Sequence, residues 1–303
     1  MKKAAVPQTG ILLAGIALFL RCSDTAAEGI RSALSFCGAV LIPSLFPVSV
    51  LSGCLLRLHA ADGTGRFTER WMRKLFGLPG TGALPLLLGM LGGFPLGAQL
   101  AVSACKAEQL TKREASRLAG ISNNAGPAFL LGTVSTMLHA PRIGIRLLGI
   151  QILSALLTGL LLRGKAEIEI KKALRPGARR ESLASILPSC IAESAGAMLR
   201  LTGAVAFFQA FSACLSPALA RLPALWQTCI LGIMELTGGL SALSETYAQA
   251  ELPLAACLIC WGGLCVHLQA AQALTCEGLP LAPYLLRKAL QAGIGMLLAI
   301  ILF

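Results

Sequence analysis

Long uncharged runs constrain this chain more than any other feature of its sequence. Residues 75–105 contain no Asp, Glu, Lys or Arg, and several other segments are almost as apolar. A helix needs roughly 20 apolar residues to cross a bilayer, and these runs approach or exceed that length. Apolar residue types make up 55% of the 303 residues and charged types only 13%. The sequence therefore predicts an all-α polytopic membrane protein.

The formal net charge of +12 does not indicate a nucleic-acid-binding protein. The Lys and Arg residues form short clusters between apolar runs, a pattern that retains loops on the cytoplasmic side of a membrane. The sequence lacks the aromatic platforms and the continuous basic face that nucleic-acid binding uses. We therefore expect a lipid bilayer around the chain and no nucleic-acid partner.

Motifs of enzymes are missing from the sequence. It has no HExxH, no GxSxG and no P-loop. An SxxK pattern spans Ser103–Lys106, but this pattern is common by chance and lacks the other motifs of a nucleophile and its base. We expect no catalytic residue and no enzyme activity. Active transport would then use an ion gradient or a partner protein.

Eleven cysteines are present, and nearly all of them lie within apolar runs. Packing as a small apolar side chain is the ordinary role of such residues. Cys257 and Cys260 form a CxxC with Cys265 nearby, but no second pair stands at the spacing of a zinc site. The cysteines therefore predict packing rather than a metal site, and we expect no cofactor.

Nine apolar elements divide the chain. They are residues 4–20, 32–56, 82–105, 118–139, 142–162, 183–214, 224–243, 252–275 and 281–303. The first resembles a signal peptide, but the next run begins almost at once, so we expect a retained helix with a cytoplasmic N-terminus. A basic linker at 164–182 separates residues 30–163 from residues 183–303, and residues 1–29 form an N-terminal helix and loop.

The stretch GGFPLGA (Gly92–Ala98) interrupts the third apolar element. Basic residues are dense on both sides of this element, with five in residues 57–74 and four in residues 106–117. Both flanks are therefore expected to be cytoplasmic loops. Residues 82–105 would form a re-entrant hairpin with GGFPLGA as its tip, because Gly permits tight turns and Pro disfavours a continuous helix.

The second half repeats this order. A second hairpin is expected at 224–243, with ELTGG (Glu235–Gly239) at its tip. Each half then reads as helix, hairpin, interrupted helix and helix, and an odd number of crossings per half gives the halves opposite orientations. The separation of Phe94 and Asn124 equals that of Thr237 and His267. The sequence thus predicts two inverted repeats, which in secondary transporters place the solute site near the bilayer midplane.

Polar residues mark two of the interrupted segments. SNNAGP (Ser122–Pro127) predicts an unwound helix whose Asn side chains recognise a polar solute or an ion; a helix cap at the membrane surface is the structural alternative. WGGLCVHLQAAQ (Trp261–Gln272) places His267 and two glutamines after a Gly–Gly break. Polar side chains in such helices usually face the bundle interior, and packing is the alternative role for His267.

Three charged residues inside apolar elements are further candidates. Glu235, at the second tip, predicts proton or cation coupling if it lies at membrane depth, and solvation if the tip is shallow. Glu193 and Arg200 lie seven residues apart, so they share one helix face. Arg200 could attract an anionic solute or belong to a structural ion pair.

GGFPLGA, SNNAGPAFLLGT, MELTGG and WGGLCVHLQ occur in this order along the chain. From about residue 30 to the C-terminus they resemble the YlbJ family of sporulation integral membrane proteins, in the nucleoside-recognition or Gate superfamily. The resemblance implies an endospore former and a fold similar to concentrative nucleoside transporters, whose hairpins and broken helices enclose the solute. It also implies the family's proposed task, the movement of dipicolinic acid from the mother cell across the outer forespore membrane.

Residues and resemblance together give the candidate site. The candidate substrate-binding residues are Gly93, Phe94, Pro95, Gly97, Gln99, Asn123, Asn124, Thr237, Gly238, His267 and Gln269, and the candidate ion-coupling or charge-compensating residues are Glu235, Glu193 and Arg200. The first tip of the family often continues with a basic residue where this chain has Gln99. A dicarboxylate would then need compensation from hairpin helix N-termini, His267 or Arg200, because a buried unpaired anion is costly.

The sequence therefore favours a transporter of a small anionic solute, with dipicolinate preferred, that uses alternating access and is coupled to sodium or protons. It would lie in the bacterial cell membrane and, by resemblance, in the outer forespore membrane. One alternative is a transporter of a nucleoside or another polar metabolite. Another is a structural or assembly component of a sporulation membrane complex. Further partners would be a second copy of the chain or other sporulation membrane proteins.

Overall fold

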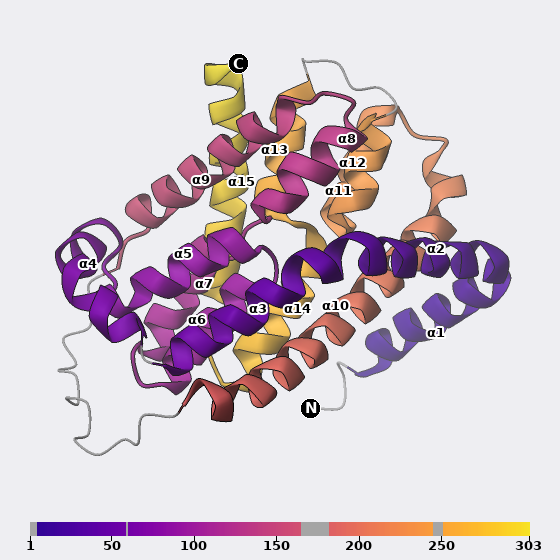
Figure 1. The fold of residues 1–303 in the computed structure, drawn as a ribbon. Helices are drawn as coiled ribbons and strands as arrows, with labels where there is room; N and C mark the ends of the chain where they lie inside the picture. Colours follow the sequence, from indigo (N-terminus) through magenta and orange to yellow (C-terminus); the bar gives the residue numbers. More distant parts are fainter. Residues whose placement is uncertain (1–4, 59, 165–181, 245–250) are drawn as a thin grey trace.

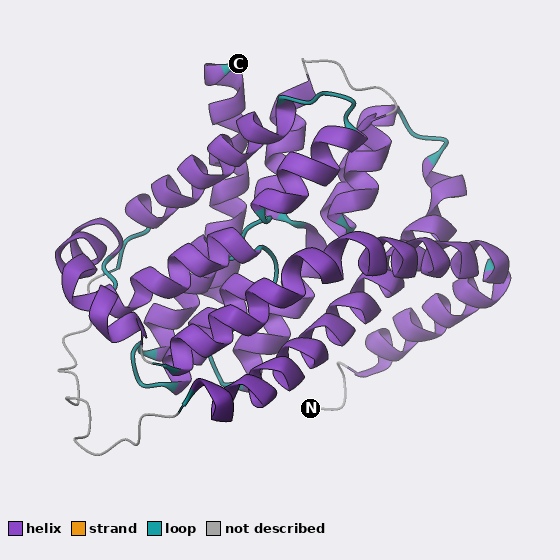
Figure 2. Cartoon of the chain, in the orientation of Figure 1, coloured by secondary structure: helices purple, strands orange, loops and turns teal. Residues whose placement is uncertain are grey.

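The computed structural model describes residues 5–58, 60–164, 182–244 and 251–303. These residues form helices joined by turns and short loops, and no strand occurs among them (Figure 2). The all-α class predicted from the apolar runs is confirmed. Nearly all of the basic linker at 164–182 lies outside the described residues.

The first half contains most of the short helices. They are α1 (Ala5–Arg21), α2 (Ser23–Phe36), α3 (Ile42–Arg57), α4 (Ala60–Phe76), α5 (Ala83–Gly92), α6 (Leu96–Lys106), α7 (Lys112–Ser122), α8 (Ser135–Met137) and α9 (Ile143–Leu161). Two segments are π-helical, η1 (Cys37–Leu41) and η3 (Phe129–Val134), and one is a 3₁₀ turn, η2 (Gly80–Gly82).

The second half has fewer and longer helices. They are α10 (Leu183–Leu219), α11 (Ala224–Met234), α12 (Leu236–Ser244), α13 (Leu252–Trp261), α14 (Gly263–Cys276) and α15 (Ala282–Leu302).

Five stretches of helix in the described residues are long and apolar enough to cross a membrane. They are Ser23–Arg57, Ile143–Leu161, Leu183–Leu219, Leu252–Cys276 and Ala282–Leu302. A hydrocarbon core of about 30 Å needs helices of this length. The chain is therefore a multi-pass membrane protein by the length and composition of its helices.

The two longest helical stretches pack against each other in opposite directions (Figure 1). Gly29 in α2 approaches Ala210 in α10 so closely that a Cβ on Gly29 would stand 2.9 Å from the Ala210 Cα. Farther along, the hydroxyls of Ser49 and Ser194 are 3.0 Å apart. The residue numbers rise along α2 and α3 while they fall along α10, so the pair is antiparallel.

Each half continues with a pair of short helices and then a broken helix. The pair α5 and α6 turns at Gly93–Pro95, and the pair α11 and α12 turns at Glu235. The helix that follows is interrupted at residues 123–126 in the first half and at Gly262 in the second. Gly262 has a φ of +90°, which Gly adopts at little cost. Single helices, α9 and α15, end the halves.

The prediction that residues 57–74 and 106–117 form loops is wrong in part. Residues 60–76 form α4, because Met72 and Phe76 give this basic segment an apolar face that is buried against the bundle. Residue 112 already begins α7, where Thr111 and Glu114 form a capping box. The basic residues of both segments therefore lie mostly on helices.

Two large apolar clusters surround a polar layer. One cluster contains residues of α4 to α7, α14 and the start of α15, and the other contains residues of η3, α9, α12, α13 and the end of α15. Tyr284 belongs to the first cluster and Ala299 to the second, with Lys288 and Gln291 between them on α15. All cysteines except Cys276 are buried or half-buried free thiols, which agrees with a packing role.

Candidate functional site

The turns of the two helix pairs meet the breaks of the interrupted helices. Gly93, with a φ of +83°, lies so close to the first break that a Cβ on it would stand 2.8 Å from the Gly126 nitrogen. The ring of Phe94 lies against the second break, where a Cβ on Gly262 would stand 2.8 Å from it. Glu235 in the other turn abuts the same break at Gly263. Both turns therefore converge on one region.

Asn123 and Asn124 lie in the first break and are buried. Asn124 Oδ1 accepts a hydrogen bond of 2.8 Å from Gln291 Nε2 on α15. Asn123 Nδ2 donates to the Tyr284 hydroxyl at 3.2 Å, and its Oδ1 accepts from the Ala98 backbone N–H at 3.4 Å. The unwound helix predicted from SNNAGP is present, and the surface cap is wrong, because these residues follow the C-terminal end of α7 inside the bundle.

The backbone freed by this break finds a side-chain partner in α9. Gln151 donates from Nε2 to the Ala125 carbonyl at 2.8 Å and accepts from the Ala125 N–H at 3.0 Å. Buried backbone groups require such partners in a membrane protein. Gln151 thus holds the interrupted helix open at a fixed position.

Lys288 brings a positive charge into this layer. Its side chain is 0% exposed, and its Nζ donates to the Asn123 carbonyl at 2.9 Å, to Gln291 Oε1 at 2.8 Å and to Asn124 Oδ1 at 3.3 Å. The ammonium also lies 5.4 Å from the centroid of the Phe94 ring. No ion pair in the described part of the chain includes Lys288. Buried charges are usually paired, because desolvation is costly.

Arg287 and Lys288 stand near the start of the last apolar element, where basic residues usually mark the cytoplasmic end of a span. Both are buried within α15, where Arg287 donates to the carbonyls of Pro283 and Leu162. Their charges looked like retention signals because they stand near the start of an apolar run. Helix geometry instead turns Lys288 and Gln291 into the bundle.

Glu235 is buried at the second turn, so the solvated alternative is wrong. Its carboxylate accepts from the backbone N–H groups of Thr237 at 3.0 Å and Gly238 at 2.8 Å, and from the Thr237 hydroxyl. Gln209 Nε2 on α10 donates to the same hydroxyl at 3.1 Å. A carboxylate at the first turn of α12 is favoured by the unpaired N–H groups and the helix dipole.

His267 and Gln269 on α14 are buried and incompletely hydrogen-bonded. His267 Nδ1 lies 3.0 Å from the Tyr284 hydroxyl, and the ring meets Trp261 edge-on. Within the described residues, His267 Nε2 and Gln269 Oε1 have no hydrogen-bond partner. Buried polar atoms in native proteins normally have one, so these two are available to a solute or water.

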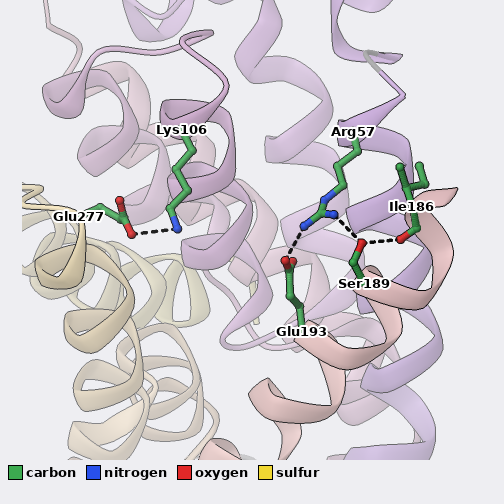
Figure 3. A network of polar contacts seen from close by, with 6 residues as sticks. All are labelled: Arg57, Lys106, Ile186, Ser189, Glu193 and Glu277. Carbon is green, nitrogen blue, oxygen red and sulfur yellow. Dashed lines mark hydrogen bonds and ion pairs between the residues drawn. The ribbon is translucent and has the colours of Figure 1, made fainter. Parts of the chain in front are cut away.

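A cleft of about 370 Å³ lies between α3, α6, α10 and α14. Pro95, Gln99, Arg200 and Gln269 line it, so it reaches the turn of the first helix pair. Two ion pairs flank it (Figure 3): Lys106 with Glu277 at 2.8 Å, and Arg57 with Glu193. Glu193 therefore pairs with Arg57 and leaves Arg200 facing the cleft.

Comparison with known proteins gives one informative similarity. No model of a protein family matches the chain, and no solved structure matches it. The sporulation integral membrane protein YlbJ of Bacillus subtilis (strain 168) is 26% identical, in an alignment that covers 93% of this chain and 79% of the relative. This match supports YlbJ-family membership.

The candidate residues of this chain fall into three groups. The first group, Phe94, Asn123 and Asn124, lies around Lys288. In the second group, Thr237 and Gly238 donate hydrogen bonds to Glu235. The third group lines the cleft and consists of Pro95, Gln99, Arg200 and Gln269. Gly97 packs against Ser122, where a Cβ would stand 2.4 Å from the Ser122 carbonyl oxygen. Glu193 is at the rim.

Sequence reasoning missed Tyr284, Lys288 and Gln291 on α15, and Gln151 and Ser154 on α9. On α15, Lys288 follows Tyr284 by four residues and Gln291 follows Lys288 by three. On α9, Ser154 follows Gln151 by three residues. Both sets lie within apolar spans. This spacing places each set on one helix face. Polar residues so placed in a membrane helix usually face the interior, so the signal was present.

Proposed function

We propose that this chain is a multi-pass transporter that moves a small organic anion across a bacterial membrane during sporulation by alternating access. The observation that supports this most is the burial of Lys288 among neutral hydrogen-bond acceptors, where a helix turn meets a helix break. An anionic group of the solute would offset the desolvation cost of the ammonium.

The arrangement of elements supports two inverted repeats with re-entrant hairpins. Apart from α4, which stands between the long helix and the helix pair in the first half only, both halves run in the order long helix, helix pair, broken helix and single helix, and the long helices are antiparallel. In this proposal α5 and α6 enter from the side of the basic linker, which the positive charge makes cytoplasmic, and α11 and α12 enter from the other side. Broken helices then form a site near the midplane.

Dipicolinate is the solute that we favour. It is an aromatic dicarboxylate, so one carboxylate could pair with Lys288 while the ring contacts Phe94. Arg200 would attract the second negative charge through the cleft, which ends near Pro95. The similarity to a sporulation protein supports a role in spores, and the outer forespore membrane is the proposed location. A proton or sodium gradient would drive uptake, with Glu235 as the coupling group.

A nucleoside or another polar ring is the second candidate. The amide side chains of Asn123, Asn124 and Gln291 gather in one layer and could hydrogen-bond a neutral heterocycle. A neutral solute would leave the Lys288 charge uncompensated, which is why we prefer an anion. Competition between uridine and dipicolinate separates the two candidates.

The deciding experiment is dipicolinate uptake into proteoliposomes under imposed sodium and proton gradients. We expect saturable uptake by the unmodified chain, loss of uptake in Lys288→Gln, and normal uptake in the matched control Lys112→Gln, whose side chain is exposed. Uridine should not compete.

Folded protein that moves neither solute in either gradient would contradict the transport proposal. Stoichiometric copurification with another membrane protein would then favour an assembly role.

A further inference from the structure

Helix α4 carries an outward face that the proposed transport site does not use. Phe67, Arg70, Trp71 and Lys74 follow the spacing i, i+3, i+4 and i+7, which places them on one face of a helix. Phe67 is 86% exposed and Trp71 61% exposed, and Arg70 and Lys74 are exposed as well. Large aromatic and basic side chains on one exposed face are typical of helices at a membrane interface.

The opposite face of α4 holds the helix against η2, the turn that precedes α5. The Thr68 hydroxyl donates to the Gly80 carbonyl at 3.0 Å, and the Glu69 carboxylate accepts from the Gly80 N–H at 2.6 Å. Met72 and Phe76 are buried below. This packing prevents α4 from rotating about its axis, so Phe67 and Trp71 are held facing outward.

The angle between α4 and the following arm fits an orientation along the membrane surface. Residues 63–76 and 80–92 are bent by 91°. If the arm that contains α5 enters the bilayer, α4 lies nearly parallel to the surface. Aromatic rings then reach the acyl boundary while basic groups remain level with the lipid headgroups.

The charges around this face are positive. In the described part of the chain, neither Arg70 nor Lys74 takes part in an ion pair. Arg163, which is exposed, donates to the Lys74 carbonyl at 3.1 Å, so a further cationic side chain lies beside α4. Anionic lipids give the cytoplasmic leaflet a negative surface that attracts such clusters.

We propose that the outward face of α4 binds the headgroups of anionic phospholipids. Phe67 and Trp71 insert at the acyl boundary, and Arg70 and Lys74 contact the phosphate groups. This inference needs the chain to lie in a bilayer but does not depend on the solute, or on whether the chain transports one.

The test uses the full chain reconstituted in phosphatidylcholine vesicles that contain brominated phosphatidylglycerol or, at equal mole fraction, brominated phosphatidylcholine. Bromine quenches nearby tryptophan, and the Trp71 signal is the difference between the chain and its Trp71→Phe variant. We expect stronger quenching by the anionic lipid, and a preference that weakens at high salt.

Variants that neutralise charges show which basic residues produce the preference for the anionic lipid. Arg70→Gln combined with Lys74→Gln should reduce the lipid preference by roughly tenfold or more. Arg142→Gln combined with Arg221→Gln removes two exposed positive charges elsewhere and should leave the preference unchanged.

Equal quenching by both lipids would overturn the proposal, as would an unchanged preference in the Arg70 and Lys74 variant. Displacement by free glycerol phosphate would also overturn it, because the face would then take a soluble phosphate rather than a membrane lipid.

Discussion

Lys288 in the last helix donates a hydrogen bond of 3.3 Å to Asn124 Oδ1, so the two halves of the chain meet at a buried charge. Gln291 contacts both residues, at 2.8 Å from Lys288 Nζ and 2.8 Å from Asn124 Oδ1. A break in one half and a helix of the other thus form one polar layer. The other groups of this layer are neutral, so the positive charge of the ammonium has no negative partner there and could be balanced by an anion.

Lys288→Gln should leave the stability of the purified protein within about 1 kcal/mol or raise it, because glutamine keeps a donor and removes an unpaired buried charge. Thermal unfolding in detergent measures this, with Lys112→Gln as the surface control. A fall in Tm of many degrees would contradict a role in binding and indicate that the charge holds the fold together.

Gly262→Ala should destabilise the protein by about 1–3 kcal/mol, because the residue has a φ of +90° and its Cβ would meet the Phe94 ring. Gly293→Ala in α15 is the control, since a Cβ there meets nothing within 4 Å, and should be neutral or slightly stabilising. Thermal unfolding compares the two. If both substitutions changed Tm by the same amount, a side chain at Gly262 would cause no strain at the helix break, which would contradict the prediction.

Glu235→Gln should lower stability by about 0.5–2 kcal/mol, because the carboxylate accepts three hydrogen bonds at the start of α12. If Glu235 also couples transport, the variant should lose stimulation by an ion gradient while it still exchanges solute without one. Uptake and counterflow assays on the same preparation separate these effects. Gradient stimulation that survives in the variant would exclude Glu235 as the coupling group.

Arg200→Gln should weaken the apparent affinity for an anionic solute several-fold, because Arg200 lines the cleft while Glu193 is paired with Arg57. Glu193→Gln should change affinity little, and its effect on stability should stay below about 1 kcal/mol for an exposed ion pair. Initial rates of uptake over a range of solute concentrations measure both. Similar KM values in the unmodified chain and Arg200→Gln would contradict a role for the cleft in entry.

The sequence by itself determined the helical class, most of the apolar spans and the places where helices break. These features are local: a span needs about 20 apolar residues, and Gly93–Pro95, SNNAGP and Gly262–Gly263 interrupt helices through the conformational limits of Gly and Pro and the competition of Asn with the backbone. Apart from α4, the order of elements in the two halves could therefore be anticipated from short stretches of chain.

Only the tertiary structure decided which groups meet at these breaks. The burial of Lys288 depends on how α15 is rotated against α7 and α9. The partner of Glu193 is Arg57, 136 residues away, and Glu235 caps its own helix while it abuts Gly263. The partners of Lys288 and Glu193 lie far away in the chain, so packing and desolvation across the whole bundle select them, although the spacing of the polar residues on α15 already indicates which face is buried.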